Sequence, residues 1–388
     1  KENKDKEDIA IRPTSETVIY PYVKKWIRNY RDLPLRINQW CNIIRWEFNS
    51  PTPFIRSREF LWQEGNTFHE TKDSAEKEVH DILGIYKDFY ERVMLVPVIS
   101  GKKTEIEKFC GGEYTTTLET YIPESCKAIQ CCTSHSLGQN FSRMFDIRYQ
   151  DVNNNLEDNF IWQNSWGLST RSIGVMIMVH GDNKGLVLPP KIATTQIVIV
   201  TKEDNIYEKN NFEEYMIMIG DLLKKYRVYF DRGEENIGRK FNKWEKLGIP
   251  IRIEIGKKEF ENKMVTIFRR DEMRRIQKKI YDLVDMDQIL VSVETNMFNK
   301  AKKKLERHVI KNDKWYDFEK NINNNAVIVP WCGNNDCEKD ICNSIKKKYL
   351  FSIKTLCIPF DKKYNIDNER CIKCENEYKC SVIFGRSF

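Results

Sequence analysis

The sequence predicts an α+β protein that continues into an α/β part, with two or three domains in all. Its 388 residues are 40% hydrophobic, which is enough to form more than one core. From residue 1 to about 190, helical and strand patterns follow one another without regular alternation, which favours an antiparallel sheet with flanking helices. From residue 196 onward, short apolar runs alternate with helical patterns, which is typical of a mixed or parallel sheet.

The first part of the chain carries both helix and strand patterns. A short helix is expected after Thr14 or Ser15, either of which can act as its N-cap. The apolar residues on one face of this helix are Val18, Tyr22 and Trp26. Residues 35–48 and 127–133 are expected to be strands, and residues 74–93 have the clearest helical periodicity. The positions of that helix for which we expect core packing are Val79, Ile82, Leu83, Tyr86, Phe89, Tyr90 and Val93.

The second part begins after an expected exit strand and linker at residues 186–190, because the two prolines there disfavour continuing either element. The elements expected next are a strand at 196–200, a helix at 212–226, a strand at 228–230, a helix at about 237–247 and a strand at 251–255. Basic helical sequence, a loop at residues 321–325 and a cysteine-rich end follow. The expected division into domains is therefore 1–190, 191–300 and 301–388.

Composition and charge restrict the class of protein. Aromatic residues at 12% and charged residues at 31% favour a folded protein over a disordered one. The net charge of +7 fits an acidic partner such as RNA, and equally fits simple solubility. Basic clusters that could contact phosphates lie at residues 269–270, 274–275, 302–304 and 346–348, although each alone is better read as a solvated helix face.

No apolar stretch reaches the length of a membrane span, and no signal-peptide pattern opens the sequence. Twelve cysteines are present, and the best-spaced ones form close pairs near one end, which in an intracellular protein favours metal ligands over disulfides. We therefore expect a cytoplasmic location and no membrane association.

Three separated segments, residues 45–48, 56–60 and 167–171, each carry an arginine with acceptors one or two residues away. Arginine is always charged and presents a rigid fork of donors, which suits carboxylates and phosphates held in a fixed pose. This pattern indicates a site for a nucleoside triphosphate lying across a sheet, where charge develops on the phosphates during transfer.

These segments also carry a family resemblance. Residues 45–47 with 56–65 resemble motif 2 of class II aminoacyl-tRNA synthetases, and residues 167–171 resemble motif 3. Residues 11–17 and the ending at 384–388 are similar to the signature and tail of prolyl-tRNA synthetases of the eukaryotic and archaeal type. The resemblance implies a class II catalytic domain at 1–190, an anticodon-binding α/β domain at 191–300 and a small zinc-binding α/β domain at 301–388.

The resemblance implies an ATP site with Mg²⁺. Arg45 would bridge the proline carboxylate and the α-phosphate, and Arg171 would hold the terminal phosphates of a bent ATP. Phe60 would pack near the adenine, and Gln130 would approach the phosphates or their Mg²⁺. The other residues implied to hold the nucleotide are Glu47, Arg56, Ser57, Thr133 and Ser169. Arg45 and Arg171 are the catalytic candidates, acting through position and charge without a protein nucleophile.

The resemblance also implies a proline site. Thr14 and Glu16 match the residues that take the imino-acid nitrogen. The remaining residues implied to shape this pocket, besides Arg45, are Trp62, Glu64, Phe109 and His135. Cys131 and Cys132 stand where many relatives have smaller residues, so the wall of the pocket is expected to be narrower here. Two further departures are Asn66, where relatives usually have histidine, and Phe388, where tyrosine is usual.

Two close cysteine pairs, Cys332 with Cys337 and Cys371 with Cys374, fit a tetrahedral, structural zinc site. Cys342 and Cys380 are alternative ligands, and Cys357 is expected to be a buried neighbour. Unmetallated free cysteine is the other interpretation.

The expected function is ATP-dependent activation of L-proline to prolyl-adenylate, followed by transfer to tRNA(Pro). A synthetase for another amino acid, such as threonine or glycine, is the nearest alternative. A non-catalytic RNA-binding or regulatory relative is the other, and it predicts broken arginine positions, whereas all three arginines are present. No motif 1 helix and strand is visible ahead of this sequence, so either a front portion is missing or the parent protein is longer. A homodimer is expected by resemblance only.

Overall fold

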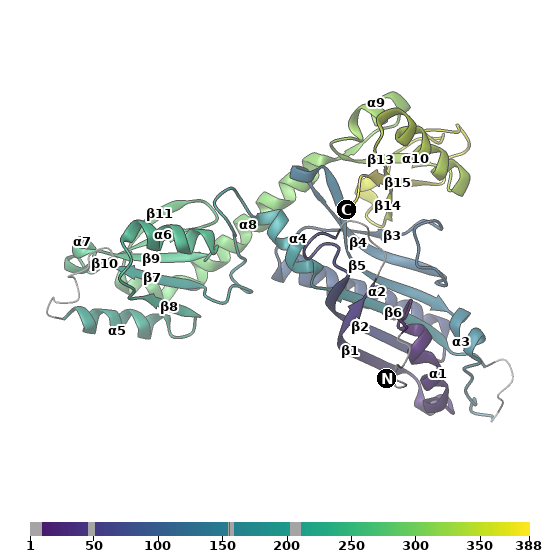
Figure 1. Ribbon diagram of the computed structural model, residues 1–388, viewed down its shortest axis with the longest axis horizontal. Helices are drawn as coiled ribbons and strands as arrows, with labels where there is room; N and C mark the ends of the chain where they lie inside the picture. The colour runs from purple at the N-terminus through teal and green to yellow at the C-terminus, as the bar shows by residue number, and fades with distance from the viewer. Residues whose placement is uncertain (1–9, 46–50, 154, 156–158, 202–210) are drawn as a thin grey trace, which may run out of the picture. The chain divides into compact units, whose positions relative to one another are not determined.

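A computed structural model describes residues 10–45, 51–153, 155, 159–201 and 211–388 (Figure 1). The chain divides into two compact units. The first consists of Lys1–Asp88, Val98–Val175 and Leu305–Phe388, and the second of Phe89–Pro97 and Met176–Lys304. Within the described ranges, none of the helices combines the length and the apolar character needed to cross a bilayer.

The first unit is built on a ten-stranded sheet in the order β1-β2-β6-β5-β4-β3-β14-β15-β13-β12. The bounds of these strands are β1 Leu35–Ile44, β2 Glu59–His69, β3 Ile99–Lys102, β4 Tyr114–Ile122, β5 Lys127–Gly138, β6 Trp162–Ser169, β12 Val309–Lys311, β13 Ala326–Trp331, β14 Lys354–Pro359 and β15 Cys380–Gly385. From β1 to β3 every pairing is antiparallel, which confirms the predicted α+β class.

The helices of this unit include α1 Glu16–Trp26, α2 Lys72–Asp88, α3 Asn140–Phe145, α9 Trp315–Asn321 and α10 Asn335–Tyr349. Helix α4, Arg171–His180, begins in the same unit. Helix α2 packs along β2, β4, β5 and β6. It matches the predicted helix at residues 74–93, although a π-type turn, Phe89–Val93, replaces its last part. Of the expected core positions, Val79, Leu83, Tyr86 and Tyr90 are buried.

Helix α1 buries a face that its apolar pattern did not indicate. The side chains of Val18, Tyr22 and Trp26 are 44%, 54% and 54% exposed, whereas Tyr20 is fully buried. The Tyr20 ring meets the edges of other aromatic rings, among them Phe68 on β2, at centroid distances of 5.3–6.4 Å. Tyr20 and Val23, both fully buried, therefore define the inward face of the helix, and Val18, Tyr22 and Trp26 face outward.

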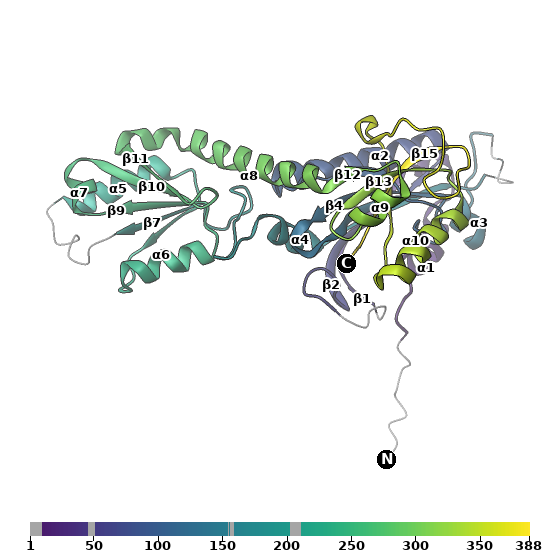
Figure 2. The same ribbon diagram turned by 90° about the horizontal axis from the view of Figure 1, so that it is seen from above.

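The second unit contains a five-stranded mixed sheet in the order β11-β10-β9-β7-β8. Its elements are β7 Ile197–Thr201, α5 Phe212–Leu223, β8 Val228–Asp231, α6 Ile237–Lys246, β9 Ile251–Ile255, α7 Lys257–Glu261, β10 Met264–Arg269, β11 Arg274–Lys279 and most of α8, Met286–His308. Strand β7 pairs in parallel with β8 and β9, as the alternating pattern predicts. Ile197 and Ile199 pack in the core that contains α5 and the start of α8, while Val198 and Val200 pack against α6 (Figure 2).

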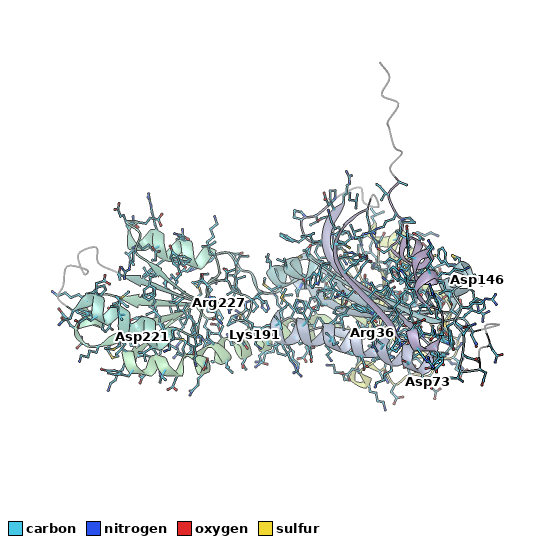
Figure 3. All side chains as sticks on the ribbon, turned by 90° about the horizontal axis from the view of Figure 1, so that it is seen from below. Arg36, Asp73, Asp146, Lys191, Asp221 and Arg227 are labelled. Atoms are coloured by element: carbon cyan, nitrogen blue, oxygen red, sulfur yellow. The ribbon has the colours of Figure 1, made fainter. Side chains whose placement is uncertain are left out.

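Two expectations about this unit are wrong. Residues 186–188 form no strand, because the N–H groups of Leu186 and Leu188 donate to the end of α6 and not to a neighbouring strand. Their acceptors are the carbonyls of Lys246, the last residue of α6, at 3.0 Å, and of Gly248, just after it, at 3.1 Å. Arg269 and Arg270 are not solvated cations on a helix face: they are buried at the end of β10 and pair with Asp271 and Asp182 at 2.7 and 2.6 Å. Arg227, labelled in Figure 3, fastens the linker by donating to the carbonyl oxygens of Ala193 and Pro190, both at 2.8 Å.

The C-terminal segment joins the sheet of the first unit. Strand β14 pairs with β3 through Ile358 opposite Lys102 and Pro359 opposite Gly101. At the tail, the Ala128 N–H on β5 donates to the carbonyl of Arg386 at 2.7 Å, and the Phe388 N–H donates to the carbonyl of Ala128 at 3.2 Å. The cysteine-rich end and the predicted nucleotide site therefore share one continuous sheet.

Candidate active site and cysteine cluster

A cavity of about 300 Å³ lies over the first unit's sheet, and most of the predicted site residues line it. These residues are Thr14, Glu16, Arg45, Phe60, Trp62, Glu64, Phe109, Gln130, Thr133, His135, Ser169 and Arg171. They come from the start of α1, the end of β1, strands β2, β5 and β6, the loop before β4 and the first residue of α4. The structure thus brings together segments that are up to 157 positions apart, from Thr14 to Arg171.

The register of the antiparallel strands explains why these side chains meet. Glu64 lies opposite Gly167, which lies opposite Thr133 on the next strand. In the neighbouring row, Ser165 lies opposite His135. Since directly opposed residues share a face of the sheet, alternate positions on adjacent strands all point into the cavity.

Two buried carboxylates, Glu16 and Glu64, lie in the cavity wall, at 6% and 5% exposure. One oxygen of Glu64 accepts from the Ser15 hydroxyl at 2.8 Å, from the Gln39 amide and from the Cys41 thiol at 3.6 Å. Glu16 accepts from the Thr14 hydroxyl and from the Ser165 side chain. Burial raises the pKa of Glu16, and the nearby charge of Glu64 raises it further, while Arg45 lowers it. The two carboxylates therefore make this wall of the cavity a favourable place for a positively charged group of a ligand.

Arg45 and Arg171 supply positive charge to the same cavity. The Arg45 guanidinium lies over the Trp62 ring at 5.7 Å from its centroid. Arg171 is fixed at the start of α4, where its side chain donates to the carbonyl oxygens of Ile55 at 2.9 Å and Gln130 at 3.1 Å. Guanidinium groups fixed in this way are preorganised for an anion.

His135 is held between two threonines and an aromatic ring. Its Nδ1 is 2.8 Å from the Thr115 hydroxyl and its Nε2 is 2.9 Å from the Thr133 hydroxyl. The Phe109 ring packs on it at a centroid distance of 5.0 Å. Burial lowers the pKa of His135 to about 4, so the ring is neutral at pH 7 and carries one donor and one acceptor.

Two predicted nucleotide residues, Arg56 and Ser57, do not line the cavity. A third, Glu47, lies outside the described residues. Arg56 and Ser57 lie in the connection between β1 and β2, where the Arg56 N–H donates to the Thr52 carbonyl at 2.9 Å. Their roles stay a prediction.

The cavity also contains residues that the sequence did not single out for the site: Gly65, Glu107, Lys108, Thr115, Ser165 and Trp166. Ser165 and Thr115 follow from strand register, which motif matching does not supply. Cys131 and Cys132, expected in the pocket wall, both line the cavity. Adjacent strand residues normally face opposite sides, but the pairing of β4 with β5 shifts register here, so that Cys131 has no opposed partner.

The two departures from the family pattern occupy definite places. Asn66 is 2% exposed, and its side-chain oxygen accepts from the Tyr20 hydroxyl at 3.1 Å. Asn66 thus keeps a hydrogen bond without a titratable ring. Phe388 has Lys127 over its ring, with the ammonium 5.0 Å from the centroid.

The four predicted cysteine ligands form one cluster. The sulfur atoms of Cys332, Cys337, Cys371 and Cys374 all lie within 4.8 Å of one another. Two of the separations are 3.7 Å, between Cys337 and Cys371, and 3.5 Å, between Cys332 and Cys374. A zinc ion with Zn–S bonds of the usual length has sulfurs about 3.8 Å apart at the edges of its tetrahedron. The cluster therefore has the size of a zinc site. Cys357 is fully buried, as expected, but it packs in the core that contains Ile99 and Leu356, not in the core that contains Cys332, Cys337 and Cys371.

Comparison with known proteins places the whole chain. Residues 1–180 match the tRNA synthetase class II core domain (G, H, P, S and T), residues 196–288 the anticodon binding domain, and residues 315–388 the prolyl-tRNA synthetase C-terminal domain. The cytoplasmic proline–tRNA ligase of Arabidopsis thaliana is 44% identical over 388 residues, covering 98% of this chain and 72% of that protein.

A solved structure gives the same result. The prolyl-tRNA synthetase of Cryptosporidium parvum, crystallised with L-proline and AMP, matches with a TM-score of 0.93 at 41% identity, over 98% of this chain and 80% of that one. A putative proline–tRNA ligase of Schizosaccharomyces pombe is 44% identical over 412 residues and 98% of this chain, which spans only 58% of that relative's length. The chain belongs to the prolyl-tRNA synthetase family of class II aminoacyl-tRNA synthetases.

Proposed function

We propose that this chain activates L-proline with ATP to form prolyl-adenylate and transfers the prolyl group to tRNA(Pro). The observation that carries the proposal is the meeting of Glu16, Glu64, Arg45 and Arg171 in one cavity of about 300 Å³. A wall of buried carboxylates for a cation and fixed guanidinium groups for anions fits an amino acid beside a nucleotide. The relative from Cryptosporidium parvum was crystallised with this pair of ligands, L-proline and AMP.

Selection of proline would rest on the wall around His135. Thr14 and Glu16 would accept the secondary ammonium, while Trp62, Phe109 and His135 would enclose the ring. A buried carboxylate discriminates strongly against ligands that leave it unpaired, whereas an apolar wall separates small rings from small chains less well.

Activation would proceed by positioning and charge. Arg45 would hold the proline carboxylate against the α-phosphate, and Arg171 would hold the terminal phosphates. Arg56, Ser57, Phe60, Thr133 and Ser169 are proposed to hold the nucleotide, together with Glu47. Mg²⁺, which Gln130 is proposed to approach, would neutralise phosphate charge when bound. Of these residues, Phe60, Gln130, Thr133 and Ser169 line the cavity with the two arginines.

The remaining parts of the proposal follow from the family and the fold. We propose a catalytic part at 1–190, an anticodon-binding part at 191–300 and a zinc-binding part at 301–388, with zinc held by the four clustered cysteines as a structural ion. A homodimer and a cytoplasmic location complete it, the latter supported by a relative from Arabidopsis thaliana named cytoplasmic.

The test is proline-dependent ATP–pyrophosphate exchange with Arg45→Ala. We expect exchange to fall by about a thousandfold, the upper range for removing one fixed group that stabilises developing charge. Arg148→Ala is the matched control, because Arg148 pairs with Asp146 at 2.7 Å and does not line the cavity. Undiminished exchange in Arg45→Ala, or exchange in wild type that depends on threonine or glycine rather than proline, would overturn the proposal.

A further inference from the structure

The cysteine cluster and the wall of the proposed proline pocket are joined by a buried hydrogen-bonded link. The loop after β3 contributes Glu107, Lys108 and Phe109 to the cavity. Both the Glu107 and the Lys108 N–H groups donate to the carbonyl of Thr104, at 3.2 and 2.9 Å. Thr104 is therefore the base of the turn that carries these wall residues.

The side chain of Thr104 is anchored to the C-terminal segment. Its hydroxyl donates to Glu338 at 3.0 Å and lies 3.0 Å from the Thr355 hydroxyl on β14. The Thr355 hydroxyl donates to the same oxygen of Glu338. Thr104, Glu338 and Thr355 are 2%, 2% and 1% exposed, so this contact is closed to solvent. Burying a carboxylate costs free energy unless it is hydrogen-bonded, and the two hydroxyl donors offset part of that cost.

Glu338 is tied directly to the cluster by its place in the chain. It follows Cys337 in the first turn of α10, and its N–H donates to the Asn334 carbonyl at 3.1 Å. The Asn334 side chain caps the same turn by accepting from the Cys337 N–H at 3.4 Å. Because Cys337 and Glu338 share this turn, an interaction that holds the Cys337 sulfur in place also restricts the position of the Glu338 carboxylate, which anchors the loop.

Two further contacts support the same loop from β14. The buried Lys103 ammonium donates to the Leu356 carbonyl on β14 at 2.7 Å, and it also donates to Glu119 on β4 at 2.7 Å. Glu107, a cavity residue, pairs with Lys354 at 3.5 Å. At the far end of the loop, the Phe109 N–H donates at 3.0 Å to the Thr115 hydroxyl, which also contacts His135.

From these contacts we propose that Glu338 is a positioning residue for the proline pocket. It transmits the order of the four-cysteine cluster, through Thr104, to the wall that carries Phe109. The inference rests on the proposed function, because it assumes that this wall encloses proline. Glu338 does not line the cavity, and the wall that it anchors carries Phe109, so the proposed effect is on binding of the amino acid.

The test compares L-proline affinity by titration calorimetry of the full chain with steady-state exchange kinetics. We expect Glu338→Ala and Thr104→Val each to raise the Kd and KM for proline by about tenfold, the effect of losing a hydrogen bond to a buried charged group, with kcat retained. Glu338→Gln, which keeps an accepting oxygen, is expected to restore binding to within about twofold of wild type. The Glu338→Ala, Thr104→Val double variant should be no worse than either single one.

Glu319→Ala is the matched control, because Glu319 pairs with Lys348 at 2.9 Å in the same segment and does not reach the loop. Thr104→Val lies away from the cysteines and keeps the test decisive if Glu338→Ala fails to fold. Equal proline affinity in wild type and Thr104→Val would overturn the coupling alone. A wild-type chain that binds no L-proline would overturn the proposed function instead.

Discussion

Gly65 is the position where one added carbon should disturb the site most clearly. A Cβ built on Gly65 would lie 2.1–2.3 Å from three ring carbons of Trp166, whereas ordinary contacts begin at 3.4 Å. Trp166 is opposite Gly65 on β6, so the indole lies on the glycine. Gly65→Ala therefore requires the ring, or strand β6, to move by roughly 1.2 Å, since a side chain and a backbone in close packing cannot share that space.

The magnitude follows from where the ring can go. Trp166 also lines a second cavity of about 510 Å³ between β1 and α2, so the indole has room to swing. We therefore expect a loss of about 1–3 kcal/mol in the free energy of unfolding, the usual cost of overpacking, and not a failure to fold. Exchange activity should fall as well, because Ser165 and Gly167 flank Trp166 and line the proposed site.

The assay is urea unfolding of wild type and Gly65→Ala, followed by tryptophan fluorescence, with proline-dependent exchange measured on the same samples. Gly84→Ala is the matched control: nothing lies within 4 Å of its added Cβ in the middle of α2, so alanine should stabilise the helix by about 1 kcal/mol. The two glycine variants should thus change stability in opposite directions. A Gly65→Ala chain as stable as wild type would refute the packing of Trp166 on the glycine.

Three further predictions concern titration and metal. Glu16→Gln should raise the melting temperature at neutral pH and should greatly weaken proline binding. The pKa of Glu16 is raised in the folded state, so the ionised side chain opposes folding once the pH exceeds its pKa in the unfolded chain; a destabilised variant would contradict this reasoning. Burial lowers the pKa of His135 to about 4, so the stability contributed by the neutral ring should be lost as the pH falls from about 6.5 toward 4. His135→Gln should therefore make the free energy of unfolding depend less on pH over that range, and an unchanged slope would contradict this prediction. Elemental analysis should find about one zinc per chain in wild type and in Cys342→Ser but not in Cys332→Ser, since Cys342 lies outside the cluster; zinc in none of them would contradict the site.

The periodicity of apolar residues correctly predicted the helices and strands whose own sequence shows which side faces the core. Strand β9 and helices α5 and α6 lie within two or three residues of the expected bounds, because each has an apolar pattern that its own core demands. The face of α1 was a different matter. Val18 and Trp26 are as apolar as Tyr20, and only the rings of β2 and α3 decide which of them is covered.

The pairing of strands far apart in the chain could not be predicted from the sequence either. Strand β14 joins β3 across more than two hundred and fifty positions, from Lys102 to Ile358, through two opposed residue pairs. No pattern within either segment specifies the other. The same limit applies to the site: residues on β2, β5 and β6 were found because their segments resemble family motifs, whereas Glu107 and Lys108 depend on a loop whose anchor, Glu338, lies far along the chain.

The hydrogen bonds around the two buried carboxylates suggest a division of labour between them. Three donors from two segments, Ser15 ahead of α1 and Gln39 and Cys41 on β1, meet on one oxygen of Glu64, which fixes that group whether or not a ligand is bound. Glu16 has Thr14 and Ser165, yet burial still raises its pKa, so its charge is compensated incompletely. An ammonium group of a ligand gains the most binding free energy beside the carboxylate whose charge is least compensated, because folding has already met the cost of burying that carboxylate. We therefore expect Glu16 to be the acceptor that selects a cationic ligand, and Glu64 to act as the fixed wall against which it is held.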